Sequence, residues 1–238
     1  MAPLFFGGER KRRNSGIKER MRIWTTQTKA FWEQLQSQGS IYCESRYAQE
    51  DPFFKERYDW FSEQMRLRIG PPPLPEIQYA IWGWKQVGNY KKERHPNFRD
   101  GNPCVDNHVF LTLEIPGDKV LLTDFDLWSY VLNGWYIPAD RADIRRFDRI
   151  NKQLGETWIP FEEKPEEIQA EIRRSWERIF DLDHPNYIQR KHKRNRWIQA
   201  SFWELKKDWV VDCIPVNGYI RANEEFAERM NLYFPKKG

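Results

Sequence analysis

The sequence predicts an α+β fold in which helices flank a mostly antiparallel sheet, built as a single domain over residues 21–238. Short strand-like segments alternate along the chain with amphipathic helical segments. The apolar segments 108–115 and 119–125 are separated by the turn PGDK, which is typical of a hairpin and therefore of antiparallel pairing. No internal repeat or low-complexity tract divides the chain.

Composition and charge exclude several classes of protein. Apolar residues make up 39% of the chain and charged residues 31%, with 12 tryptophans, a globular rather than a disordered composition. Cys43, Cys104 and Cys213 are odd in number and widely spaced, which argues against a disulfide framework and a structural zinc site. No apolar run approaches the roughly 20 residues that span a bilayer, and no secretory signal is recognisable. We therefore expect a cytoplasmic protein without a membrane partner.

Local signals predict the first elements. Residues 1–20 are basic, contain glycine and lack periodicity, so we expect a flexible extension that is able to contact phosphates. The segment MRIWTTQ (21–27) predicts the first strand. A helix is expected to begin after the capping residue Thr28 and to end at Gly39, and SIYCE (40–44) predicts a short second strand.

The clearest helical segment is DPFFKERYDWFSEQMRLRIG (51–70). Asp51 is placed to cap the helix, the following proline suits its first position, and Gly70 is expected to end it. IQYAIWGWKQ (77–86) then predicts a strand in which Gly83 allows close approach of another chain segment or a ligand. Apolar residues of the helix recur at steps of four, three and four, which predicts a buried stripe of Phe54, Tyr58, Phe61 and Met65.

The second half of the chain continues the same alternation. Residues 88–107 form a long polar and basic loop, and loops of this length are usually functional or mobile. DLWSYVLNGWY (126–136) predicts a short helix, and charged helical segments follow at 141–154 and 165–180. A basic run at 190–196 leads into WIQASFWEL and then WVVDCIPV, which we expect to be paired strands.

Signatures of common enzyme classes are absent from the sequence. It contains no GxSxG, P-loop or GxGxxG motif, and its four histidines are scattered. Asp124 and Asp126 in LLTDFDLW allow two interpretations. They could share one face of a strand and hold the divalent ion of a nuclease, or Asp124 could cap the following helix with Asp126 in its first turn. We expect the cap and predict no metal-binding residues.

Two basic clusters interleaved with aromatic residues predict a surface for DNA or RNA. Cations there would bind phosphates, and the aromatic rings would stack on bases. Solvated surface charge is the alternative explanation for each cluster. The cationic residues are Lys91, Lys92, Arg94, Arg99, Arg190, Lys191, Lys193, Arg194 and Arg196.

Glu204, in QASFWEL (199–205), is the candidate for chemistry. Ser201 and Glu204 have the S-x-x-E spacing of a capping box, in which each side chain satisfies the backbone N–H of the other at the start of a helical turn. Alternatively, Glu204 lies on a loop beside the sheet and next to an aromatic ring. There it would bond a ribose hydroxyl and stabilise an oxocarbenium-like transition state, with Gln199 and Ser201 as neighbouring polar contacts.

Six sequence blocks between Met21 and the carboxyl end carry a family resemblance. They are RIWTTQ (22–27), YDWFSEQMRLRIGPPP (58–73), IWGWKQ (81–86), HPNFR (95–99), LLTDFDLWSYVLN (121–133) and IQASFWELKKDWV (198–210). Through these blocks the chain resembles DUF3841, a family of uncharacterised bacterial and phage proteins. That resemblance implies no activity.

The order of the expected elements is also similar to that of the ADP-ribosyltransferase superfamily. Both have a first strand with a polar residue, a helix, a strand led by glycine, and a late loop that carries glutamate. The resemblance implies NAD as cofactor, with Thr25 and Gln27 against it and Tyr58 or Trp82 stacked on nicotinamide. It also implies that Glu204 is the catalytic carboxylate.

Two functions of different classes are therefore expected. The first is an NAD-dependent, ADP-ribosyltransferase-like enzyme that modifies nucleic acid or protein in phage–host conflict. The alternative is a non-enzymatic module that binds nucleic acid or a protein partner.

Overall fold

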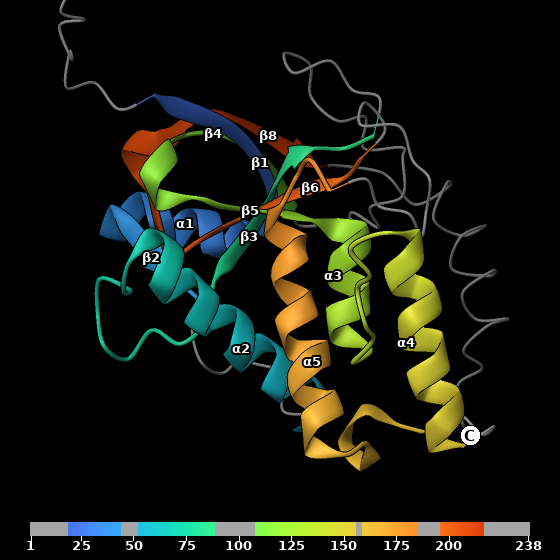
Figure 1. Cartoon of the computed structure of the whole chain (residues 1–238). Helices are drawn as coiled ribbons and strands as arrows, with labels where there is room; N and C mark the ends of the chain where they lie inside the picture. The colour runs from blue at the N-terminus through green and yellow to red at the C-terminus, as the bar shows by residue number, and fades with distance from the viewer. Residues whose placement is uncertain (1–18, 44–51, 89–107, 156–158, 185–195, 217–238) are drawn as a thin grey trace, which may run out of the picture.

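A six-stranded antiparallel sheet organises the α+β fold that the sequence predicted (Figure 1). The computed structural model describes residues 19–43, 52–88, 108–155, 159–184 and 196–216. In spatial order the strands are β5 (Leu121–Asp124), β6 (Ile198–Phe202), β3 (Ile81–Gln86), β1 (Arg20–Thr28), β4 (His108–Pro116) and β8 (Val210–Val216).

The sheet consists of two three-stranded halves that are joined weakly. Within one half β1 pairs with β4 along its whole length, and within the other β3 pairs with β6 from Ile81 to Gln86. Between the halves, the described strands β1 and β3 share one register pair, Trp24 with Trp84. The centre of the sheet is therefore the place where its ladder is least complete.

The boundaries of α1 follow the capping signals in the sequence. In α1 (Lys29–Gln38) the Thr28 hydroxyl accepts the Phe31 N–H, and Gly39 ends the helix in the left-handed conformation at φ 79°. The other α-helices in the described ranges are α2 (Pro52–Ile69), α3 (Phe125–Leu132), α4 (Arg141–Leu154) and α5 (Glu166–Trp176). None of the helices in those ranges combines the length and apolar character needed to cross a membrane.

The two larger apolar cores lie against the sheet. The first joins α2, α3, α4 and α5, and it includes Phe61 and Trp176, which are almost fully buried. The second joins β1, β4 and α1 to a two-stranded ribbon of β2 (Ser40–Tyr42) and β7 (Glu204–Lys206), around Ile23 and Leu35. In Figure 1 helices α2 to α5 lie together below the sheet, whereas α1 lies beside β2.

Two predicted strand pairings are wrong. The segments 108–115 and 119–125 form β4 and β5, but these strands lie in opposite halves of the sheet rather than in a hairpin. Likewise β6 lies between β5 and β3, whereas β8 pairs with β4 at the other edge. Alternating apolar residues identify a strand, but they do not identify its partner.

Gly83 is where β3 comes closest to β1. A Cβ atom on Gly83 would lie 2.8 Å from both the Trp24 carbonyl oxygen and Ile23 Cγ2. The segment that approaches Gly83 closely is therefore the neighbouring strand β1. This contact joins the two half-sheets next to the Trp24–Trp84 pair.

Replacing Gly83 with alanine is expected to lower the free energy of unfolding by about 1–3 kcal/mol, because a backbone carbonyl cannot move away from the new methyl group. Gly117→Ala is the matched control. Its Cβ would lie 3.1 Å from the Glu19 carbonyl oxygen and 3.2 Å from the flexible end of Met21, so a smaller loss is expected. Urea denaturation of both variants measures the difference, and equal stabilities would contradict the proposed close contact.

Candidate ligand site between β1 and β3

A side-chain hydrogen bond takes the place of strand pairing where β1 and β3 separate. Beyond the Trp24–Trp84 pair, the hydroxyl of Thr25 donates to the carbonyl oxygen of Trp82 at 2.8 Å. The Gln27 amide in turn donates to the Thr25 hydroxyl at 2.8 Å. Thr25 is only 2% exposed, and its hydroxyl acts as a buried link between the strands.

Two cavities adjoin at this separation, and both are lined by Thr26 and Trp82. The first, which we call the α1-side cavity, has a volume of about 460 Å³, within the usual range for small-molecule sites. It lies between the end of β1, α1, β2 and the start of β3, and its polar lining includes Gln27, Gln34 and Tyr42. The second, the β6-side cavity, has a volume of about 240 Å³ and is lined also by Thr25, Gly83, Trp84, His108 and Gln199.

Gln199 lines the β6-side cavity, and its side chain contains a buried polar atom that is unsatisfied within the described ranges. Its side chain is 9% exposed, and its carbonyl oxygen Oε1 has no hydrogen-bond partner among the described residues. An unpaired buried acceptor of this kind costs about 1–3 kcal/mol.

Trp82 lies at the site, but its ring is already packed against other aromatic side chains. It stacks on Phe61 with ring centroids 4.8 Å apart, and Tyr58 meets it edge-on at 6.2 Å. Burial raises the pKa of the Tyr58 hydroxyl. The structure thus brings Gln27 and Trp82 to one cavity, whereas Tyr58 lies in the aromatic core behind Trp82.

Glu204 lies on strand β7, so both placements considered from the sequence, the capping box and the loop beside the sheet, are wrong. Ser201 belongs to β6, and its hydroxyl has no hydrogen-bond partner in the described part of the chain. The Glu204 carboxylate accepts a hydrogen bond from the Tyr42 hydroxyl at 3.2 Å and lies 3.3 Å from the Lys206 ammonium. Since S-x-x-E spacing also fits two short strands around a kink at Trp203, spacing alone does not specify a helix.

Tyr42 stands between Glu204 and the α1-side cavity. The β2–β7 ribbon pairs Tyr42 directly with Glu204, and Tyr42 lines that cavity. Glu204, whose side chain is 17% exposed, lines a separate cavity of about 100 Å³ with Trp203 and Trp209. The carboxylate is therefore one hydrogen bond away from the cavity that contains Gln27 and Trp82.

Arg196 is buried, which corrects its prediction as a phosphate ligand. It is 3% exposed and donates to the carbonyl oxygens of Leu182 and His184. Its guanidinium also lies 3.9 Å from the Asp124 carboxylate. Arg196 therefore connects chain segments inside the protein. The other predicted cations lie outside the described residues: Lys91, Lys92, Arg94, Arg99, Arg190, Lys191, Lys193 and Arg194.

Asp124 caps α3, as predicted. One of its carboxylate oxygens accepts the backbone N–H groups of Asp126 at 3.0 Å and Leu127 at 3.1 Å. Burial raises the pKa of the Asp124 carboxyl despite these bonds. Within the described ranges, no group of three or more His, Cys, Asp or Glu side chains is placed to hold a metal ion.

Comparison with known proteins gives one family match. A family model described as "Domain of unknown function (DUF3841)" matches residues 22–211. No curated protein matches the chain. These comparisons support the first predicted resemblance and add no support for the resemblance to ADP-ribosyltransferases.

Proposed function

The chain belongs to the DUF3841 family, and we propose that it is an NAD-dependent, ADP-ribosyltransferase-like enzyme whose ligand occupies the cavities between β1 and β3. Its target would be nucleic acid or protein, in phage–host conflict. The chemistry of the lining supports this choice of cofactor: amide groups and a hydroxyl suit ribose and carboxamide groups, and aromatic edges suit a planar ring.

One observation carries this proposal: the Tyr42 hydroxyl that binds Glu204 belongs to a side chain of the cavity wall. Gln27 and Trp82 line the same cavity. A ribose hydroxyl that displaced the Tyr42 hydroxyl would donate its hydrogen bond to the Glu204 carboxylate without any change in the backbone. Binding of the ligand would then connect the glutamate to the reacting sugar.

The proposed reaction breaks the bond between the ribose anomeric carbon and the nicotinamide nitrogen. Nicotinamide leaves with the bonding electron pair, and positive charge develops on the ribose ring. A nitrogen or oxygen of the target then forms a bond to the anomeric carbon and loses its proton to solvent. The negative Glu204 carboxylate would stabilise the positive charge through the ribose hydroxyl.

Glu204→Gln is the direct test of this role. It is expected to lower the rate of nicotinamide release from NAD by about 100-fold, because an amide cannot balance the developing charge. Urea denaturation should show a change in the free energy of unfolding below about 1 kcal/mol, since the Tyr42 bond can be kept by the amide oxygen. Glu63→Gln, at an exposed position on α2, is the matched control and should leave the rate unchanged.

Two results would contradict the enzymatic proposal. One is the absence of NAD binding in calorimetry at millimolar ligand. The other is a Glu204→Gln variant that retains the rate of the unmodified protein. A Tyr42→Phe variant distinguishes the role of Tyr42 from that of Glu204. It removes the hydroxyl that binds the Glu204 carboxylate but leaves the carboxylate in place, so turnover should be kept.

The alternative function, a non-enzymatic module that binds nucleic acid or protein, is favoured by a different surface. Arg141, Arg145 and Arg149 recur every four residues along α4 and are exposed. None of the three forms an ion pair with a carboxylate among the described residues. Residues four apart lie on one face of a helix, so these arginines form a row that phosphates could bind.

Replacing all three arginines with glutamine should weaken binding to DNA or RNA and make it less dependent on salt. For three lost phosphate contacts, the negative slope of log K against log salt concentration should become less steep by roughly 2–3. The control replaces the exposed lysines Lys29, Lys119 and Lys207 with glutamine, which removes the same charge elsewhere. Fluorescence anisotropy over a salt series measures both slopes. Equal slopes for the two triple variants would show that α4 is not the contact surface.

A further inference from the structure

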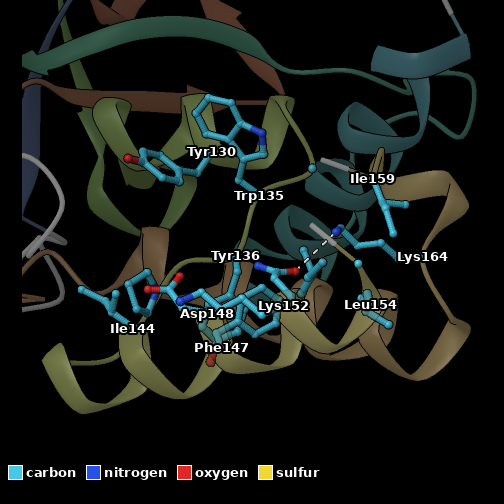
Figure 2. A pocket seen from close by; sticks show the side chains of 15 residues that line it. Tyr130, Trp135, Tyr136, Ile144, Phe147, Asp148, Lys152, Leu154, Ile159 and Lys164 are labelled. Carbon is cyan, nitrogen blue, oxygen red and sulfur yellow. Dashed lines mark hydrogen bonds between the residues drawn. The ribbon is translucent and has the colours of Figure 1, made fainter. Parts of the chain in front are cut away.

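A further cavity lies among the helices, away from the sheet (Figure 2). Its volume is about 700 Å³, and it is enclosed by the end of α3, by α4, by the segment 159–164 and by α5. None of its lining residues belongs to the two cavities between β1 and β3. A ligand site in this cavity is therefore independent of the proposed enzymatic function.

Aromatic side chains form much of the cavity wall. Trp135 is 45% exposed, unusual for so large an apolar side chain, and Tyr130 meets it edge-on at 5.3 Å. On the opposite wall Tyr136 stacks on Phe147 with ring centroids 3.9 Å apart. Figure 2 shows Trp135 and Tyr130 facing the side chains of α4 across the cavity. A planar ring could pack between these walls.

Lys164 places a positive charge at one end of this cavity. Its ammonium donates a hydrogen bond to the side-chain oxygen of Asn151 at 3.4 Å, and it has no ion pair within the described residues. Burial lowers the pKa of this ammonium, as expected for a partly desolvated cation without a counter-ion. Asp148, the carboxylate that lines the cavity, lies at the opposite end in Figure 2.

A cation in this environment is stabilised by an anion more than by any neutral partner. Hydrogen bonds between an ammonium and an anionic oxygen are about twice as strong as those between neutral groups. Asn151 supplies a single neutral oxygen, so the remaining ammonium donors can bind a ligand.

We propose that this cavity binds a small aromatic anion, with its ring between Trp135 and the α4 wall and its charged group on Lys164. The recognised chemistry is a planar ring that carries a carboxylate or sulfonate. A bare inorganic anion lacks the ring, and a neutral aromatic compound lacks the partner for the ammonium.

Fluorescence titration with anilinonaphthalene sulfonate tests the assignment, with phenylnaphthylamine as the uncharged probe of the same ring system. Lys164→Met is expected to raise the dissociation constant of the sulfonate about tenfold, the effect of losing one charged hydrogen bond. It should leave the affinity for the uncharged probe unchanged, and Lys164→Arg should retain the affinity for the sulfonate. Lys29→Met, at an exposed lysine on α1, is the control and should behave like the unmodified protein.

Competition on the unmodified protein keeps the test independent of any folding defect in the variants. Benzoate should displace the sulfonate probe at concentrations where benzamide and inorganic phosphate do not. The proposal is overturned if benzamide or phosphate competes as well as benzoate, or if a folded Lys164→Met variant binds the sulfonate as tightly as the unmodified protein.

Discussion

The interaction on which the arrangement depends is the junction between β1 and β3. One register pair, the close approach of Gly83 and the hydroxyl of Thr25 hold two half-sheets together. The strands of each half are paired with one another, so β1 and β3 can separate beyond Trp24 without loss of their outer partners. Two adjoining cavities lie at this separation.

Elements defined by neighbouring residues could be predicted from the sequence. Thr28 and Gly39 mark the two ends of α1, and Asp124 marks the start of α3, because capping depends on bonds that span only a few residues. The helix at 141–154 was predicted from its charged helical pattern, and its observed ends agree. The α+β class followed from the alternation of these local patterns.

Features that depend on distant partners could not be predicted in this way. The partner of β5 is β6, about 75 residues later in the chain, and no turn signal identifies it. Tyr42 was missed as a site residue because its importance comes from pairing with Glu204 across the β2–β7 ribbon. Arg196 was assigned to a basic surface because a run of cations does not reveal which member is buried.

Of the proposed NAD contacts, Gln27 and Trp82 share a cavity because both flank the β1–β3 separation.

The central claim is that this separation is where the ligand binds. The most direct measurement is a titration of isotope-labelled protein with NAD, followed by the amide signals in two-dimensional NMR. The account predicts that the largest shifts occur at Thr26, Gln27 and Trp82, at the strand ends that line the cavities. Shifts confined to the helices around α4, or no shifts at millimolar NAD, would contradict it.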